Sequence, residues 1–198
     1  MLRLTGPVPL VAATILWASA VCFGVNLLMR YSTTPGQAAV PPAALLADLG
    51  VFPAQGRSTL LIFAHPQCPC SRATLGELAV IMAHRRGTVD AYVLFYSPES
   101  KGRDWVKGDL WRVASHIPGV RLMEDPEGSY AIRFGAQTSG QTMLYDPKGR
   151  LLFSGGITVS RGHAGANDGR DIVESLLAGG IGGPGSTAVF GCSLRGGS

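Results

Sequence analysis

The sequence predicts an α/β protein in which a mixed central sheet lies between two layers of helices, preceded by one transmembrane helix. Apolar runs rich in β-branched and aromatic residues alternate with helical patterns in the order β-α-β-α-β-α. A hairpin and a last helix follow, which adds antiparallel strands to a parallel sheet. One long uncharged apolar segment stands at the N-terminus and predicts the membrane helix.

The N-terminal segment runs from Pro9 to Met29 without a charge and is long enough to span a bilayer. Ala18-Ser19-Ala20 also fits the cleavage site of a signal peptide, which is the alternative. The apolar run continues past that site, and this favours a retained anchor over residues 1–30.

A short N-terminus before a long C-terminal part is typical of a signal anchor. We therefore expect a single-pass protein of the inner (cytoplasmic) membrane whose soluble domain faces the oxidising periplasm or cell exterior. Residues 31–44 contain three prolines and are predicted to form a linker. Beyond Arg30, fifteen Lys and Arg residues nearly balance thirteen Asp and Glu residues, so no nucleic-acid partner is expected.

The soluble domain is predicted over residues 45–178, and its folded part should begin between Leu45 and Ser58. Thr59 to Ala64 suits a strand buried on both faces. After a turn, a helix is indicated by apolar residues at helical spacing and a closing glycine, namely Leu75, Leu78, Ala79, Met82 and Gly87.

The next elements follow the same alternation. Val89 to Tyr96 predicts a second strand, and Asp104 is a plausible N-cap for one helix. The apolar face of that helix would comprise Val106, Leu110, Val113 and Ile117. A third strand is predicted over Val120 to Met123, and Asp125-Pro126 should open a helix that Gly135 closes.

The end of the domain departs from this alternation. Thr142 to Tyr145 and Arg150 to Ser154 flank the turn Asp146-Pro147-Lys148-Gly149 and predict a hairpin, and Asp168 to Leu177 predicts the last helix. The tail, residues 179–198, is rich in glycine and is expected not to pack. Its Cys192 would either dock near Cys68 and Cys70 or remain a free thiol near the terminus.

Cys68 and Cys70 lie in the turn between the first strand and its helix. The first turn of a helix carries unpaired N–H groups and the positive end of the macrodipole, which stabilise a thiolate. Both cysteines are therefore expected to be acidic. The alternative is a pair of buried structural cysteines, which a turn flanked by prolines seldom holds.

The order of elements resembles the thioredoxin superfamily, most closely at Leu61 to Ala64 before the cysteines and at Met143 to Arg150 in the hairpin. With the anchor, the chain resembles membrane-tethered proteins of the bacterial envelope such as the TlpA, ResA and Sco types. The run His65 to Ala73, with Ser154 to Thr158 and Ser160 to His163, is most similar to RedB-type proteins.

Two features depart from that family. Its redox turn is Cys-x-x-Cys, whereas this chain reads Cys68-Pro69-Cys70. The family's cis-proline, which faces the cysteines and lines the surface where a substrate docks, is replaced here by Gly140. The resemblance implies that Ser139 and Gly140 form the opposing, substrate-binding wall of the site.

The resemblance implies first a thiol-disulfide oxidoreductase without a cofactor, which acts on a protein disulfide or dithiol. Cys68 and Cys70 would be its reactive pair, and Cys192 its possible resolving thiol. His65 could orient or deprotonate a thiol. A disulfide across one intervening residue is expected to be strained and therefore relatively oxidising.

Two other uses of the thiols stay open. A Sco-like copper-binding or copper-delivery protein would bind copper through Cys68, Cys70 and a histidine, His65 or His163. A peroxiredoxin-like peroxidase would need one thiolate together with an arginine and a hydroxyl group. The usual threonine three residues before the cysteine is absent, because His65 stands there.

Overall fold

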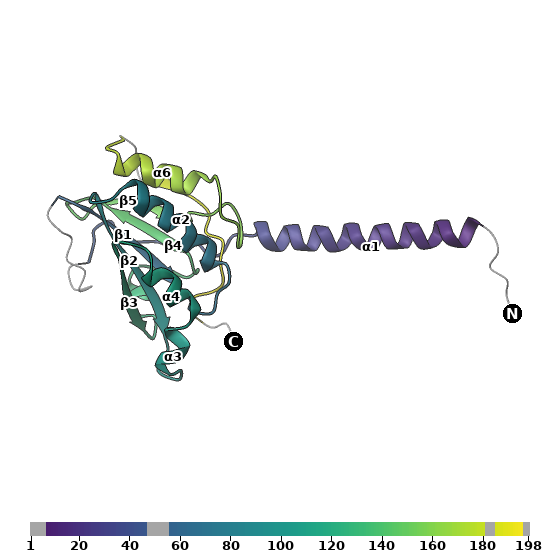
Figure 1. The fold of residues 1–198 in the computed structure, drawn as a ribbon, viewed down its shortest axis with the longest axis horizontal. Helices are drawn as coiled ribbons and strands as arrows, with labels where there is room; N and C mark the ends of the chain where they lie inside the picture. The colour runs from purple at the N-terminus through teal and green to yellow at the C-terminus, as the bar shows by residue number, and fades with distance from the viewer. Residues whose placement is uncertain (1–6, 47–55, 181–184, 196–198) are drawn as a thin grey trace. The chain divides into compact units, whose positions relative to one another are not determined.

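The computed structural model describes residues 7–46, 56–180 and 185–195, and the chain divides into two units, 1–34 and 35–198 (Figure 1). The first unit contains helix α1, Pro7–Thr33, none of whose described side chains is buried. Over an 18-residue window its mean hydropathy is 2.1, so it is long and apolar enough to cross a membrane.

The described strands of the second unit form one mixed sheet in the order β3-β2-β1-β4-β5-β6. β1 lies in its interior, parallel to β2 and antiparallel to β4, and β2 is parallel to β3. β4 and β5 form the predicted hairpin, and β6 extends it in parallel. The strands are Ser58–Ala64 (β1), Val89–Ser97 (β2), Val120–Pro126 (β3), Gln141–Tyr145 (β4), Leu151–Gly155 (β5) and Gly185–Ser186 (β6).

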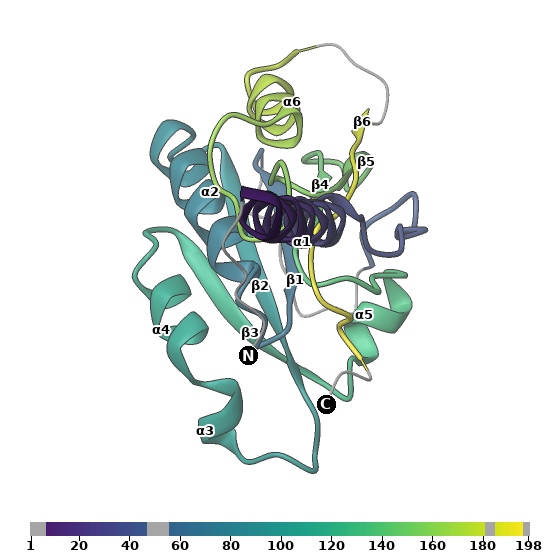
Figure 2. The ribbon, with the colours of Figure 1, turned by 90° about the vertical axis from the view of Figure 1, so that its right-hand side faces the viewer.

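Helices cover both faces of this sheet, which confirms the predicted three-layer arrangement. One core lies between the sheet and the helices α2 (Ser71–His84), α4 (Asp109–Ser115) and α6 (Asp168–Leu177). A second core, on the opposite face, includes α5 (Ser129–Arg133) and the extended residues around Leu45 (Figure 2). Alternate residues of β1, such as Leu60 and Leu61, enter different cores.

The single helix predicted from Asp104 is wrong. The structure has a short α3, Arg103–Val106, and a separate α4, because Gly108 takes an extended backbone with φ −73° and ψ −151°. Glycine favours the helix less than any other residue except proline, so the chain breaks here at little cost. The break matters for function because Trp105 precedes it and reaches the site described below.

The predicted start of the next helix at Asp125-Pro126 is also wrong. β3 continues through Pro126, on an edge strand where proline is tolerated. Asp125 still serves the helix, because its carboxylate accepts hydrogen bonds from the N–H groups of Tyr130 (2.8 Å) and Ala131 (3.1 Å) in α5. Gly128, with φ +67°, makes the turn between them.

The described tail, residues 185–195, packs on the domain, contrary to expectation. β6 pairs with β5, and Val189 and Leu194 are buried. Glycines allow the close approach, since a β-carbon on Gly156 would lie 2.5 Å from the carbonyl oxygen of Ala188. The glycines at positions 181–184 lie outside the described residues, as does most of the predicted start of the domain.

The residues just after α1 also contact the domain. The N–H of Gly36 donates to the carbonyl of Val189 (2.8 Å), and the N–H of Leu151 donates to that of Ala43 (2.9 Å). The hydroxyl of Tyr145 donates to the carbonyl of Pro42 (3.1 Å). The later part of the predicted linker therefore lies along the folded domain.

Candidate functional site

The loop from β1 to α2 carries Cys68 and Cys70. The N–H of Cys68 donates to the carbonyl of His65 (3.0 Å), and that of Ser71 donates to the carbonyl of Cys68 (3.1 Å), so the chain coils tightly before the helix. Cys70 is the N-cap residue of α2 with φ −65° and ψ −28°. Both sulfurs therefore lie at the N-terminal end of a 14-residue helix.

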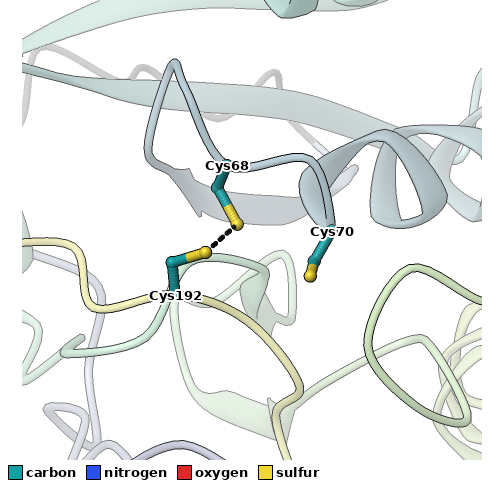
Figure 3. Close-up of side chains that lie close together, drawn as sticks. All are labelled: Cys68, Cys70 and Cys192. Carbon is teal, nitrogen blue, oxygen red and sulfur yellow. Dashed lines mark hydrogen bonds between the residues drawn. The ribbon is translucent and has the colours of Figure 1, made fainter. Parts of the chain in front are cut away.

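The C-terminal tail brings a third cysteine to this loop. The N–H of Ser139 donates to the carbonyl of Cys192 (2.8 Å), and the N–H of Leu194 donates to that of Gln137 (2.9 Å). These two bonds place the Sγ of Cys192 2.9 Å from the Sγ of Cys68, within hydrogen-bond distance (Figure 3). The sulfurs of Cys68, Cys70 and Cys192 all lie within 4.8 Å of one another.

Cys68 is the thiol that the site stabilises as an anion. Burial alone would raise the pKa of Cys68. Hydrogen bonds from the thiol and N–H of Cys192 and from the hydroxyl and N–H of Ser71 outweigh burial and lower that pKa. When Cys68 is a thiolate, Cys192 is therefore the donor between the two sulfurs.

The other two thiols hold their protons more tightly, so the expectation that Cys70 is acidic is wrong. Burial and the nearby charge of Cys68 raise the pKa of Cys70. Burial, followed by the hydrogen bond to Cys68, raises the pKa of Cys192 to about 12. A low-dielectric site that stabilises one sulfur anion disfavours a second one beside it.

Ser139 lies opposite the cysteine loop and connects its parts. Its hydroxyl accepts a hydrogen bond from the N–H of His65 (2.8 Å) and lies 2.7 Å from the hydroxyl of Ser71. If Ser139 donates to Ser71, the Ser71 hydroxyl remains free to donate to the Cys68 sulfur. Both serines are buried, which limits competition from water.

Gly140 follows Ser139 and precedes β4. Its φ is +93°, and its N–H donates to the carbonyl of Phe63 (2.8 Å). A β-carbon there would approach the hydroxyl oxygen of Thr74 to 3.0 Å. The positive φ and this contact explain why glycine stands at the position.

His65 contributes an aromatic surface to the site and does not belong to the cluster of three sulfurs. Its ring stacks on Tyr96 (centroids 5.9 Å apart) and meets Trp105 edge-on (5.4 Å). Its Nδ1 accepts the N–H of Gln67 (3.2 Å), and burial lowers its pKa. The ring is therefore held neutral with its other nitrogen protonated.

A pocket of about 300 Å³ opens beside the Cys68 and Cys192 pair. It combines aromatic, polar and cationic side chains, and its lining comprises His65, Gln67, Lys101, Trp105 and Ser193 together with the two cysteines. A group bound there would lie against the sulfurs of Cys68 and Cys192.

His163, the other candidate metal ligand, does not join the cysteines. It is exposed, and its Nδ1 lies 3.0 Å from the Ser160 hydroxyl and 2.8 Å from the Arg161 carbonyl. Arg161 itself is half-buried and donates to the carbonyl of Gly191, and its charge partly offsets the rise in the pKa of Cys70 and Cys192. Arg72, by contrast, is exposed and pairs with Asp109.

Comparison with solved structures identifies similar folds, whereas comparison of the sequence alone finds no relative. No protein-family model matches the sequence, and a search of curated proteins found no match. An uncharacterized conserved protein from Geobacillus kaustophilus superposes with a TM-score of 0.60 at 16% identity, covering 83% of this chain and 93% of that one. A hypothetical protein from Sinorhizobium meliloti 1021 gives 0.58 at 21% identity, covering 83% and 95%.

A secreted disulfide oxidoreductase of Mycobacterium tuberculosis also matches, at a TM-score of 0.43 and 16% identity, covering 63% of this chain and 83% of that chain. In this chain β1 lies between a parallel β2 and an antiparallel β4, with the hairpin strand β5 next. This strand order, with helices on both faces of the sheet, is the thioredoxin-like fold that the sequence predicts.

Several residues of the site do not stand out in the sequence. Ser71 follows Cys70 directly, and its N-terminal helix position could have indicated a donor to a thiolate. Trp105 comes from the short helix α3 and Arg161 from a loop, both distant in sequence from the cysteine turn, and Arg161 in particular resembles an ordinary surface charge. Gly191, which carries the tail past Ser139, has no local signal because its role depends on a contact 52 positions away.

Proposed function

We propose that this protein is a membrane-anchored thiol-disulfide oxidoreductase in which Cys68 is the attacking thiolate and Cys192 the resolving thiol. The observation that carries the proposal is the 2.9 Å approach of the two sulfurs, one stabilised as an anion and the other protonated beside it. Thiolates attack disulfides, and a second thiol close by completes the exchange.

The exchange has two balanced steps. The Cys68 thiolate attacks one sulfur of a substrate disulfide, forms a mixed disulfide and releases the other sulfur as a thiolate, which takes up a proton. Cys192 then loses its proton and attacks the Cys68 sulfur, which releases the second substrate thiolate and leaves a Cys68–Cys192 disulfide. The substrate gains two electrons and the protein loses two, and the reverse sequence oxidises a dithiol.

Cys192 suits the resolving role better than Cys70. A Cys68–Cys70 bond would close a small ring across Pro69, where the torsion that disulfides prefer is hard to reach. Cys192 approaches from a separate segment and is under no such ring constraint, and the charge of Arg161 partly offsets the raised pKa of the thiol that must ionise in the second step.

The pocket beside the two sulfurs supports a polypeptide substrate. Trp105 and His65 offer an aromatic surface for an apolar side chain next to the substrate cysteine, and Lys101 adds a positive charge. We propose that α1 anchors the chain in the inner membrane and that the domain faces the periplasm or cell exterior, where substrates contain disulfides. The resemblance to RedB-type envelope proteins agrees with this arrangement.

Trapping of the mixed disulfide tests the proposal. The full chain in detergent is incubated with a peptide that contains one disulfide, and the adduct is identified by mass spectrometry. Cys192→Ser should accumulate the peptide on Cys68, Cys68→Ser should form no adduct, and His163→Ala should turn over like the unmodified protein. An adduct on Cys70 or on Cys192 in place of Cys68 would contradict the assignment.

A further inference from the structure

The three cysteine sulfurs at the N-terminal end of α2 are one more than disulfide exchange requires. Exchange needs two thiols, yet Cys70 lies within 4.8 Å of both Cys68 and Cys192 (Figure 3). Cys68 and Cys70 are buried, and Cys192 is half-buried beside an open pocket. A small ion therefore has a way into a partly enclosed cluster of soft donors.

We propose that Cys68, Cys70 and Cys192 together bind one soft metal ion, Cu(I), through three sulfur atoms. This site goes beyond the exchange activity and does not depend on it. It also differs from a site of two cysteines and a histidine, because Cys192 of the tail takes the place of His163.

The geometry needs only a small adjustment. An ion about 2.3 Å from each of three sulfurs holds the sulfurs about 4 Å apart in a trigonal plane. The Cys68 and Cys192 sulfurs, now 2.9 Å apart, would have to separate by about 1 Å, and the longest of the other distances, at most 4.8 Å, would shorten by less than that. Cys192 is on a loop segment after β6, which is where such a movement is easiest.

The donor set favours Cu(I) over Zn²⁺. Thiolates select soft ions, and structural zinc almost always takes four ligands. Among the described residues, the cluster contains the three cysteines and no histidine or carboxylate. His65 uses its Nδ1 for the N–H of Gln67, and the Nδ1 of His163 faces its own loop.

Charge in the surroundings supports three thiolates. The positive charge of Arg161 partly offsets the effect of burial on the pKa of Cys70 and Cys192, and the N-terminal end of α2 lies at the cysteine loop. Cysteine binds a metal ion as the thiolate, so binding of Cu(I) should release a proton from each ligand thiol that is protonated in the free protein. No electron moves, and a bound ion occupies both exchange thiols.

Competition with a coloured Cu(I) chelator, bicinchoninate, measures the site. The reduced full chain in detergent is titrated without oxygen, and one Cu(I) per chain is expected. Cys68→Ser, Cys70→Ser and Cys192→Ser should each weaken binding at least a hundredfold. His163→Ala and Cys22→Ser, which leave the cluster intact, should bind as the unmodified chain does.

X-ray absorption at the copper edge identifies the ligands of the bound ion in the unmodified chain, so this test does not depend on the folding of a cysteine variant. In the unmodified chain, three sulfurs at about 2.3 Å from the copper and no nitrogen ligand are expected. Two sulfurs and a nitrogen, undiminished binding by Cys192→Ser, or no stoichiometric binding would each overturn the proposal. If peptide trapping on Cys68 succeeds while Cu(I) fails to bind, the metal site is wrong and the exchange activity stands.

Discussion

Gly191 crosses the carbonyl group of Ser139 so closely that a β-carbon at position 191 would lie 1.9 Å from the Ser139 oxygen. Cys192 is the next residue, and its carbonyl accepts the N–H of Ser139. This contact fixes the tail over the site and sets the position of the third sulfur. Absence of a side chain at Gly191 is therefore a condition for the Cys68–Cys192 pair.

Gly191→Ala should separate Cys192 from Cys68. The new methyl group meets backbone atoms that cannot move independently, so the tail must shift, with a loss of about 2 kcal/mol in stability. Formation of the intramolecular disulfide by a mild oxidant, followed by mass spectrometry, should slow at least tenfold. Gly76→Ala, at an exposed helical position with open space around it, is the matched control, and equal rates for the two variants would refute the role of Gly191.

Ser71→Ala should make Cys68 less acidic. The Ser71 hydroxyl helps lower the pKa of Cys68, so its loss should raise that pKa towards the value of an ordinary cysteine. Alkylation of Cys68 by iodoacetamide slows as the pH falls through this pKa, because the thiolate takes up a proton. The midpoint should lie below that of an ordinary cysteine in the unmodified chain and move up in Ser71→Ala.

Ser115→Ala serves as the control for that pH profile, since the Ser115 hydroxyl is exposed and bonds only within its own helix turn in the hydrogen bonds described. Its profile should match that of the unmodified chain. If the midpoint in the unmodified chain equals that of an ordinary cysteine, the site does not stabilise the Cys68 thiolate and the assignment is wrong.

Trp105→Ala should weaken recognition of peptide substrates. Trp105 forms the edge-on contact with His65 and lines the pocket beside the sulfurs. We expect KM for a disulfide-containing peptide to rise about tenfold, which corresponds to about 1.4 kcal/mol. The rate with hydroxyethyl disulfide, too small to reach the aromatic surface, should stay the same, and Trp105→Phe should restore most of the affinity. A parallel fall for both substrates would indicate damage to the thiols instead.

Arg170→Met should destabilise the domain by about 3 kcal/mol, because it leaves the buried Glu77 carboxylate without its charged partner. Glu77 also accepts the N–H of Gly165 (2.6 Å), so this pair ties the loop that carries Arg161 to α2. Unfolding by denaturant measures the loss. The double variant Glu77→Gln with Arg170→Met should lose less, and an equal loss would show that the ion pair is not its source.

The elements that depend on local signals could be predicted from the sequence. β1, the reactive turn and α2 follow from an apolar run, two prolines and a helical repeat, and all three are adjacent in the chain. The hairpin is similarly local, since Asp146 accepts the N–H groups of Lys148 and Arg150 (2.8 Å each) and Gly149 has φ +76°.

The features that depend on distant contacts could not be predicted. Helix position alone indicates two acidic thiols, whereas burial and the nearby charge of Cys68 raise the pKa of Cys70. The glycine-rich composition of the tail is typical of a segment that does not pack. Val189 and Leu194 are nevertheless buried, on a surface that exists only after the sheet has formed. Only this packing places Cys192 beside Cys68; without it, Cys192 would be a free thiol near the terminus.

The linkage formed on mild oxidation tests the central claim most directly. Trypsin cuts after Arg57, Arg72, Arg170 and Arg195, so Cys68 and Cys70 share one peptide and Cys192 lies in another. After oxidation of the full chain, tandem mass spectrometry should find the two peptides joined through Cys68 and Cys192, with Cys70 free to alkylate. A disulfide between Cys68 and Cys70 within one peptide, with Cys192 alkylated, would contradict the account.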